Sequence, residues 1–193
     1  MSMYEIEAKW ELDIDQYIKL HDFFVKCGAT RSSGTDIFCV NKLDPSQNPM
    51  RLRIRPDGTG FVTIKKMVKN YIRRENELKL SSKNVAEEVL AVVDDLGYTP
   101  FLKIHKSGVN LEVKIGSSDF HIALYAAFSG DKVKYFLELE LDKGFVDHKN
   151  PENSANTLET SLWSFFNVTL KKMIQEEDIK LCDKMLWQYF TRN

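Results

Sequence analysis

Apolar and polar residues alternate along the first stretch of the chain, residues 4–11, with a charged side chain at every second position. A period of two sends successive side chains to opposite faces of an extended strand, so this pattern predicts a β-strand with one charged face. The Asp57-Gly58 pair predicts a tight hairpin turn between two further strands. The same alternation recurs at residues 51–55, 61–65, 111–115 and 137–142.

Apolar residues spaced three or four apart predict helices between these strands. The first helix is expected over residues 14–25, with Gly28 as a natural stop, and the second over residues 85–96. A third is expected from about residue 157 to residue 173, and a short one over residues 185–189. Many strands with few helices in this order predict an α+β fold built on a largely antiparallel sheet.

The bulk composition narrows the class of protein. A chain of 193 residues that is 43% hydrophobic and 28% charged is expected to form one globular domain over residues 1–193. The net charge of −1 gives no support to a nucleic-acid or membrane partner. Three scattered cysteines, no apolar signal core and no apolar run of about 18 residues predict a cytoplasmic protein with reduced thiols.

The charges on the predicted strands are sorted by sign, which is unusual for a sheet face that only meets water. Three arginines on one strand face repel one another unless an anion or opposed carboxylates lie across from them, and paired glutamates are relieved by a divalent cation. The sorted residues are Glu5 and Glu7 on the first strand, Arg51, Arg53 and Arg55 on a middle strand, Lys65 on the next, and Glu138, Glu140 and Asp142 on a late strand.

Two arrangements account for this sorting. In a closed antiparallel barrel, the charges line the interior, the apolar faces point outwards, and amphipathic helices cover them. In a β-sandwich, the charges lie on solvated faces and the core is on the other side. The first arrangement provides oxygen ligands for a metal next to cations for phosphates, and thus suits a phosphate chain that carries a divalent ion. Charge sorting alone leaves both arrangements open.

Short motifs then indicate a family. The order of these motifs along nearly the whole chain resembles the CYTH, or triphosphate tunnel, proteins, which include class IV adenylyl cyclases, thiamine triphosphatases and inorganic tripolyphosphatases. The motifs are Glu5-Ile-Glu7-Ala-Lys9 (ExExK), Asp36-Ile-Phe38 (D-x-Y, with Phe for Tyr), Leu52-Arg53-Ile-Arg55 (LRxR), Thr63-Ile-Lys65 (TxK), Arg73-Arg-Glu75-Asn-Glu77 (RxExE), Leu96-Gly97-Tyr98, Lys106 and Glu138-Leu-Glu140 (ExE).

The resemblance implies a closed antiparallel β-barrel with helices outside and an active site within it. Carried over residue by residue, it implies Mg²⁺ or Mn²⁺ as the cofactor and a small-molecule triphosphate as the partner. The implied metal ligands are Glu5, Glu7, Glu138 and Glu140. The implied substrate-binding residues are Lys9, Arg53, Arg55, Lys65, Arg73 and Lys106, and the implied catalytic residues are Lys9, Glu75 and Glu77. Arg51 matches no motif, and we expect it at the mouth of the barrel.

This sequence departs from the family pattern at three places. Gly108 stands where the family usually has an arginine, Tyr125 stands about where it has a metal-binding aspartate, and Lys66 replaces the start of the Gly-Pro pair of cyclase-like members. The function expected first is hydrolysis of inorganic tripolyphosphate, thiamine triphosphate or a nucleoside triphosphate. A class IV adenylyl cyclase is the alternative, and a non-catalytic nucleotide- or polyphosphate-binding protein is the second. A homodimer is left open.

Overall fold

The computed structural model describes residues 3–80 and 83–191, and the side chains within them except those of residues 83–87. Strands are the most abundant regular structure in this part of the chain. They are β1 (Met3–Leu12), β2 (Thr30–Asn41), β3 (Met50–Ile54), β4 (Gly60–Lys69), β5 (Ile72–Leu80), β6 (Tyr98–Ile115), β7 (Ser118–Ser129), β8 (Lys132–Leu141) and β9 (Lys180–Leu181).

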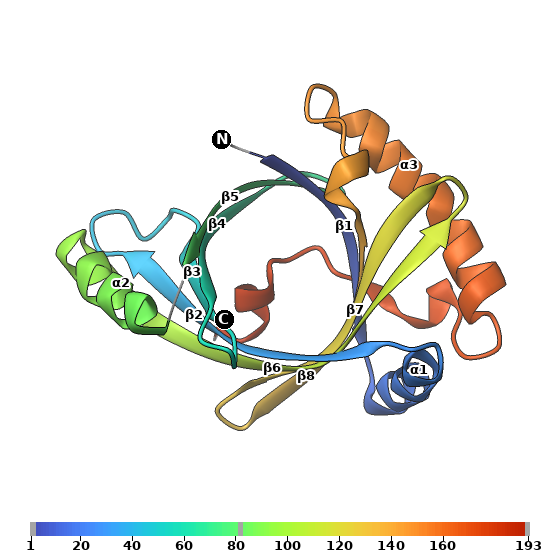
Figure 1. Cartoon of the computed structure of the whole chain (residues 1–193), viewed down its shortest axis with the longest axis horizontal. Coiled ribbons are helices and arrows are strands. Elements are labelled where there is room, and N and C mark those ends of the chain that lie inside the picture. The colour runs from blue at the N-terminus through green and yellow to red at the C-terminus, as the bar shows by residue number, and fades with distance from the viewer. Residues whose placement is uncertain (1–2, 81–82, 192–193) are drawn as a thin grey trace.

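Eight of the strands in the described residues form a closed antiparallel barrel (Figure 1). Their order is β5-β4-β3-β2-β6-β7-β8-β1, and pairing of β1 with β5 closes the ring. The short β9 pairs with the far end of β1. The prediction of a closed antiparallel barrel is confirmed. The alternative of a sandwich is wrong because β1 pairs with both β8 and β5, the two ends of the remaining strand order, and so closes one ring.

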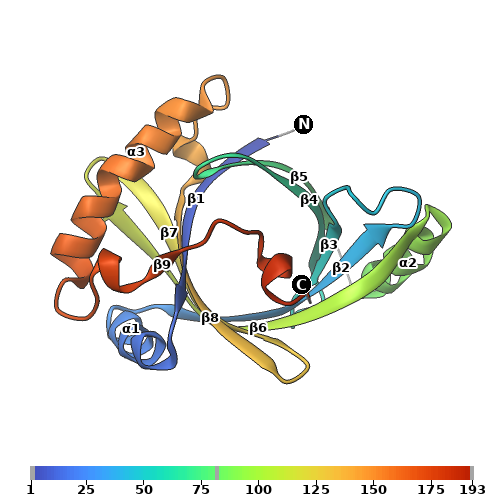
Figure 2. The same cartoon turned by 180° about the vertical axis from the view of Figure 1, so that it is seen from behind.

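Helices lie on the outside of this barrel (Figures 1 and 2). Helix α1 starts where the Asp13 side chain accepts a hydrogen bond from the Gln16 amide, and it ends before Gly28, which has a positive φ of 91°. The helices are α1 (Ile14–Lys26), α2 (Lys83–Asp95) and α3 (Pro151–Ser164), followed by the π-helical turn η2 (Phe165–Leu170) and the short 3₁₀ turns η1 (Lys143–Phe145), η3 (Glu176–Asp178) and η4 (Leu186–Tyr189).

The third helix was expected to begin at about residue 157, but α3 begins at Pro151. Proline lacks an amide hydrogen and has a fixed φ, so it is well suited to the first turn of a helix. The polar residues 151–156 therefore form the first turns of α3 even though they lack an apolar stripe. The expected helix over residues 14–25 and the short turn near residues 185–189 are confirmed. None of the helices in the described residues is long and apolar enough to span a membrane.

The main hydrophobic core lies between the outer face of the barrel and the helices. Outward-facing side chains of β1, β7 and β8, such as Ile6, Ile122 and Leu139, pack with Phe24 of α1 and Leu158 of α3 in one cluster. Helix α2 covers the outer face of the opposite wall. Because the apolar side of each strand points outwards, its polar side points into the barrel.

The C-terminal segment closes one end of the barrel. Leu186 and Phe190 pack against the inward-facing side chains Phe38, Ile104 and Phe136. Figure 2 shows this segment, drawn in red, running from β9 to the barrel opening. This contact gives the interior an apolar end, and the remaining interior is polar.

Candidate functional site

The barrel encloses a cavity of about 100 Å³, which we call the central cavity. Its lining combines charged side chains from β1, β3, β4, β5, β6 and β8 with apolar side chains from the C-terminal segment. The lining residues are Glu5, Glu7, Lys9, Phe38, Pro49, Arg51, Arg53, Thr63, Lys65, Arg73, Lys106, Glu138, Glu140, Met185, Leu186 and Trp187.

A second cavity, of about 260 Å³, adjoins the central cavity. Both cavities are lined by Arg53, Lys106, Glu138 and Glu140, so the polar interior continues past these residues towards the other end of the barrel. The second cavity is lined further by polar residues, including Arg55.

Strand β1 supplies the predicted ExExK residues to the central cavity. Alternation directs Glu5, Glu7 and Lys9 inwards, and each keeps less than a tenth of its surface exposed. Burying three charged groups in this way is costly unless they are paired, so their partners determine what the site can do.

Glu5, Glu7 and Glu140 form a group in which one carboxylate oxygen from each lies within 4.8 Å of the others. Burial and the neighbouring Glu5 raise the pKa of Glu140 well above its usual value. Burial raises the pKa of Glu5 as well, although Lys65 opposes this. These three carboxylates, which we call the acidic trio, are the group of carboxylates in the described residues that is spaced to share one cation.

Glu7 differs from the other two because cations flank it. The Arg73 guanidinium donates one hydrogen bond of 2.9 Å to the Glu7 carbonyl and lies 3.2 Å from its carboxylate. The Lys9 ammonium lies 3.3 Å away. Burial raises the pKa of Glu7, but Arg73 and Lys9 together lower it to about 2. Glu7 therefore stays ionised at any ordinary pH.

Glu138, the fourth predicted metal ligand, is bound by other groups. Its carboxylate accepts a 2.5 Å hydrogen bond from the Tyr125 hydroxyl and lies 2.8 Å from the Lys9 ammonium. The structure thus brings together three of the four predicted ligands and directs the fourth towards Lys9. Tyr125 lies on the inner face of β7, as its place in the family pattern predicts.

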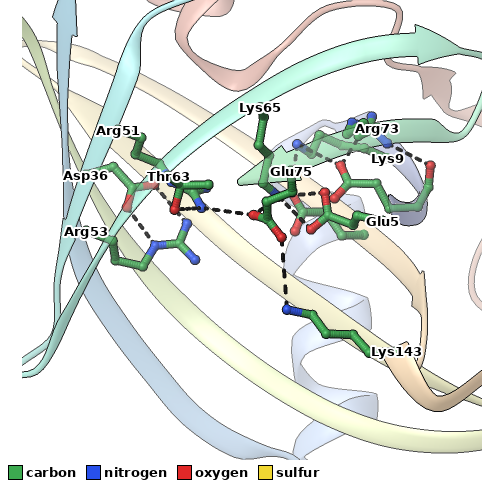
Figure 3. Close-up of polar contacts among 12 residues, drawn as sticks. Glu5, Lys9, Asp36, Arg51, Arg53, Thr63, Lys65, Arg73, Glu75 and Lys143 are labelled. Atoms are coloured by element: carbon green, nitrogen blue, oxygen red, sulfur yellow. Dashed lines mark hydrogen bonds and ion pairs between the residues drawn. The ribbon is translucent and has the colours of Figure 1, made fainter. Parts of the chain in front are cut away.

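Arg53 is held by a buried carboxylate. Its Nε and Nη2 atoms donate to the two carboxylate oxygens of Asp36 at 2.7 and 2.9 Å (Figure 3). Asp36 is completely buried, and although burial raises its pKa, the Arg53 guanidinium holds that pKa far below its usual range. The D-x-Y motif located Asp36, but no pattern in the sequence indicated that Asp36 orients Arg53.

Another cluster of ion pairs, shown in Figure 3, joins Lys65, Glu75 and Arg51. The Lys65 ammonium contacts both Glu5 oxygens at 2.5 and 2.6 Å and lies 3.4 Å from Glu75. Arg51, expected at the mouth of the barrel, lines the central cavity instead. Its Nη2 atom donates to the Thr63 hydroxyl at 3.3 Å and lies 3.8 Å from Glu75.

Lys106 has a different environment from the other cations. Its ammonium lies 3.6 Å from the centre of the Tyr125 ring, and in the described residues no carboxylate forms an ion pair with it. Burial lowers the pKa of Lys106 to about 7, even though Glu138 opposes the shift. Lys106 can therefore gain or lose a proton near neutral pH.

The glycine at position 108 is required by the packing of two strands. Gly108 pairs with Tyr125 across β6 and β7, and a Cβ atom there would lie 1.9 Å from the Leu124 carbonyl oxygen. No side chain fits this backbone geometry. The family's arginine at this place is thus excluded by the close approach of the strands.

Three predicted site residues do not line the central cavity: Glu75, which contacts the lining residues Lys65 and Arg51, together with Arg55 and Glu77. The Arg55 guanidinium lies over the Phe61 ring at 4.7 Å and lines the second cavity. Glu77 is exposed on β5, two residues beyond the buried Glu75. The central cavity is also lined by Met185, Leu186 and Trp187, which no motif in the sequence marks.

Comparisons with known proteins place this geometry among solved structures. Neither the protein-family models nor the curated proteins that were searched match this sequence.

Solved structures of three proteins match over almost the whole length of both chains. The PH1819 protein of Pyrococcus horikoshii is 18% identical, with a TM-score of 0.68 and coverage of 96% of this chain and 97% of that one. The Hippeastrum protein HpAC1, a candidate adenylyl cyclase with a dominant triphosphatase activity, is 14% identical, with a TM-score of 0.63 and coverage of 96% and 94%. A candidate adenylate cyclase of Bacillus halodurans is 13% identical, with a TM-score of 0.62 and coverage of 98% and 99%.

The agreement extends over the full chain, and it concerns the same closed barrel whose interior is described above. The chain therefore has the CYTH, or triphosphate tunnel, fold that its motifs predict.

Proposed function

We propose that this protein is a divalent-metal-dependent enzyme that cleaves a phosphoanhydride bond of a triphosphate inside the barrel. The substrates we consider first are inorganic tripolyphosphate, thiamine triphosphate and a nucleoside triphosphate. One observation carries the proposal: the acidic trio and the cationic side chains of Lys9, Arg51, Arg53 and Lys65 line the same cavity.

The residues present fit a divalent ion. The acidic trio offers carboxylate oxygens, which are the ligands preferred by Mg²⁺ and Mn²⁺, and these oxygens are close enough to reach one ion. We infer that Glu5, Glu7 and Glu140 hold the metal. A bound ion would supply neutralisation of phosphate charge and orientation of the attacking water.

The cations of the cavity have separate tasks in this proposal. Arg53 is oriented by Asp36 and keeps its remaining N–H groups for a phosphate oxygen. Lys65 and Lys9 are paired with glutamates in the free protein, so a bound phosphate chain shares cations that are already in position. Cations that are already held in position stabilise the negative charge that develops on the phosphates in the transition state, because they need not reorganise first.

In this scheme Lys106 is the residue that donates a proton. Because its pKa is about 7, it can be protonated in the bound state and can give that proton to the departing phosphate. Glu75 lies near Lys65 and Arg51 and supports both cations. We propose Glu75 as a positioning residue for these two cations. Glu77, exposed on the same strand, has no role in this scheme.

The solved structures support hydrolysis before cyclisation. HpAC1 is described by its dominant triphosphatase activity, although it is also a candidate adenylyl cyclase. The Bacillus halodurans protein is a candidate adenylate cyclase, so cyclisation of ATP is the second candidate function. In both proposed reactions the same cations would hold the phosphates. In cyclisation the ribose 3′-hydroxyl attacks the α-phosphorus and pyrophosphate leaves, whereas in hydrolysis water is the nucleophile and phosphate or pyrophosphate is released.

One assay tests the proposal. The purified protein is incubated with tripolyphosphate, thiamine triphosphate or ATP, with Mg²⁺ or Mn²⁺, and the products are separated by chromatography. Release of phosphate or pyrophosphate supports hydrolysis, whereas cyclic AMP with pyrophosphate supports the cyclase. Binding of a triphosphate without turnover would identify a binding protein. Failure to bind any triphosphate at low salt would overturn the proposal.

A further inference from the structure

The three arginines at positions 51, 53 and 55 have the same alternation phase but different surroundings. Arg51 and Arg53 line the central cavity, and Arg55 does not. Strand β3 ends at Ile54, so Arg55 already belongs to the turn towards Gly58. Its guanidinium stacks on Phe61 and lines the second cavity, beyond the residues that the two cavities share. Arg55 thus lies at a different level along the barrel.

The two arginines that β3 supplies to the central cavity differ in how fully they are bound. Arg53 uses two of its nitrogen atoms on the buried carboxylate of Asp36, with short hydrogen bonds. Arg51 has only a 3.3 Å hydrogen bond to the Thr63 hydroxyl and a 3.8 Å ion pair with Glu75. The Nε atom of Arg51 is buried and has no hydrogen-bond partner. A buried donor without a partner is rare in folded proteins and indicates a missing acceptor.

The neighbours of Arg51 show which kind of acceptor would fit. Thr63 is its partner in the pairing of β3 with β4, and Lys65 is two residues further along β4. The Lys65 ammonium is paired with Glu5 and Glu75, and neither carboxylate gives Arg51 Nε a partner. An anion is favoured there over a neutral acceptor, because hydrogen bonds from a cationic donor to an anionic acceptor are the stronger ones. Nε and Nη2 lie on one edge of the guanidinium, the edge that binds two oxygens of one phosphate group. Nε has no partner and Nη2 has only the 3.3 Å hydrogen bond to Thr63, so a phosphate would take up Nε and share Nη2 with the Thr63 hydroxyl.

We propose that Arg51 is the second phosphate-gripping arginine of this site, beside Arg53, in the place that the motif resemblance gives to Arg55. This inference rests on the proposed function, since it takes a triphosphate in the central cavity as the ligand. Thr63 and Glu75 hold the guanidinium in position, and the phosphate oxygen completes the hydrogen bonding of Nε.

The test is equilibrium binding of tripolyphosphate, measured calorimetrically with Ca²⁺ as the ion so that turnover is slow. The variants are Arg51→Gln, Arg51→Lys and Arg55→Gln, which compare the same change at two positions of one chain segment. We expect Arg51→Gln to weaken binding by about 10- to 100-fold, because a charge-assisted pair of hydrogen bonds is lost. Arg51→Lys keeps the charge but not the fork and should fall between that variant and the wild type.

We expect Arg55→Gln to change the dissociation constant by less than about threefold, in keeping with a rim charge. The salt dependence of binding is a second readout, and it should become shallower in Arg51→Gln and stay unchanged in Arg55→Gln. Urea unfolding of each variant checks that the fold is intact. If Arg51→Gln fails to fold, the comparison of the dissociation constants of Arg51→Lys and Arg55→Gln still tests the inference.

Two results would overturn the inference alone: wild-type binding in the folded Arg51 variants, or a larger loss in Arg55→Gln than in the Arg51 variants. A wild-type protein that binds no tripolyphosphate would instead overturn the proposed function, and this inference with it.

Discussion

The two faces of the barrel wall differ in almost every physical property although they belong to the same strands. On β8, Leu137, Leu139 and Leu141 are fully buried in the outer core, and the residues between them, Glu138 and Glu140, point into the cavities. Burial of the leucines contributes to folding through the hydrophobic effect, at about 1.5–3 kcal/mol for each side chain. Buried ion pairs contribute little net stability, because desolvation offsets their attraction.

Folding and chemistry are thus separated across one layer of backbone. Packing on the outer face stabilises the barrel, and the barrel in turn holds the charged side chains of the inner face in fixed positions. Changes on the outer face should therefore alter stability, whereas changes on the inner face should alter binding and turnover.

The largest effect is expected from removal of the divalent ion. Excess chelator should abolish turnover, because the acidic trio then repels the phosphate chain that the ion would otherwise bind. The outer core does not depend on the ion, so the midpoint of thermal unfolding should change little. Rates and unfolding curves with and without chelator check this. Undiminished hydrolysis in excess chelator would remove the metal from the proposed mechanism.

Two neighbouring residues on β8, Leu139 on the outer face and Glu140 on the inner face, should show directly that stability and function can be changed separately. Leu139→Ala should lower the free energy of unfolding by about 2–5 kcal/mol, because it leaves a cavity in the outer core. Well below the unfolding temperature, its affinity for tripolyphosphate should match that of the wild type. Urea unfolding and calorimetric binding measure the two quantities.

The matched variant is Glu140→Gln, one residue along. It should reduce turnover by about 10- to 100-fold through weaker metal binding, with the free energy of unfolding little changed. If Glu140→Gln destabilises the fold as much as Leu139→Ala does, the two faces are not separable in the way we describe.

A smaller effect is expected from the tyrosine that binds Glu138. Tyr125→Phe removes the hydroxyl that donates to that buried carboxylate, so it should cost about 1–3 kcal/mol of stability. The same substitution on the outer face, Tyr135→Phe, should stay within about 0.5 kcal/mol, since Tyr135 packs against Tyr17 through its ring. Equal losses in the two variants would contradict an inner-face role for the Tyr125 hydroxyl.

The smallest expected effect is on the number of protons that the protein takes up when it binds a triphosphate. The pKa of Lys106 is about 7 in the free protein, so its ammonium loses its proton as the pH rises above 7. A bound triphosphate favours the charged form, so binding between pH 7 and pH 8 should take up a fraction of a proton. The groups facing Lys106 are Asp36, Arg53, Lys9 and Glu138.

Calorimetry in buffers with different ionisation enthalpies measures this uptake. The control is Lys106→Arg, in which the guanidinium stays charged throughout this range and the uptake should be reduced. The protons of the triphosphate itself contribute equally to both proteins and cancel in the comparison. Identical uptake in both would exclude Lys106 as the group that gains the proton.

Local patterns in the sequence predicted much of the fold because they follow from local geometry. Period-two alternation predicted β1 and β8, and Gly28 predicted the end of α1, since these features depend on neighbouring residues. The order of the motifs predicted the closed barrel and proposed Glu5, Glu7 and Glu140 as ligands of one metal site. In the folded barrel these three carboxylates lie together. The start of α3 was missed because its first turns carry no apolar stripe.

Strand periodicity assigns each charged residue to one face of its strand, because successive side chains alternate. The level of a residue along the barrel follows instead from the folded ring, because strand tilt and the pairing of distant strands set that level. For this reason Arg51 lies in the central cavity and Arg55 beyond it, although both share one alternation phase. Contacts between distant segments likewise direct Glu138 to Tyr125 and Lys9, exclude a side chain at position 108, and bring Leu186 to the end of the barrel.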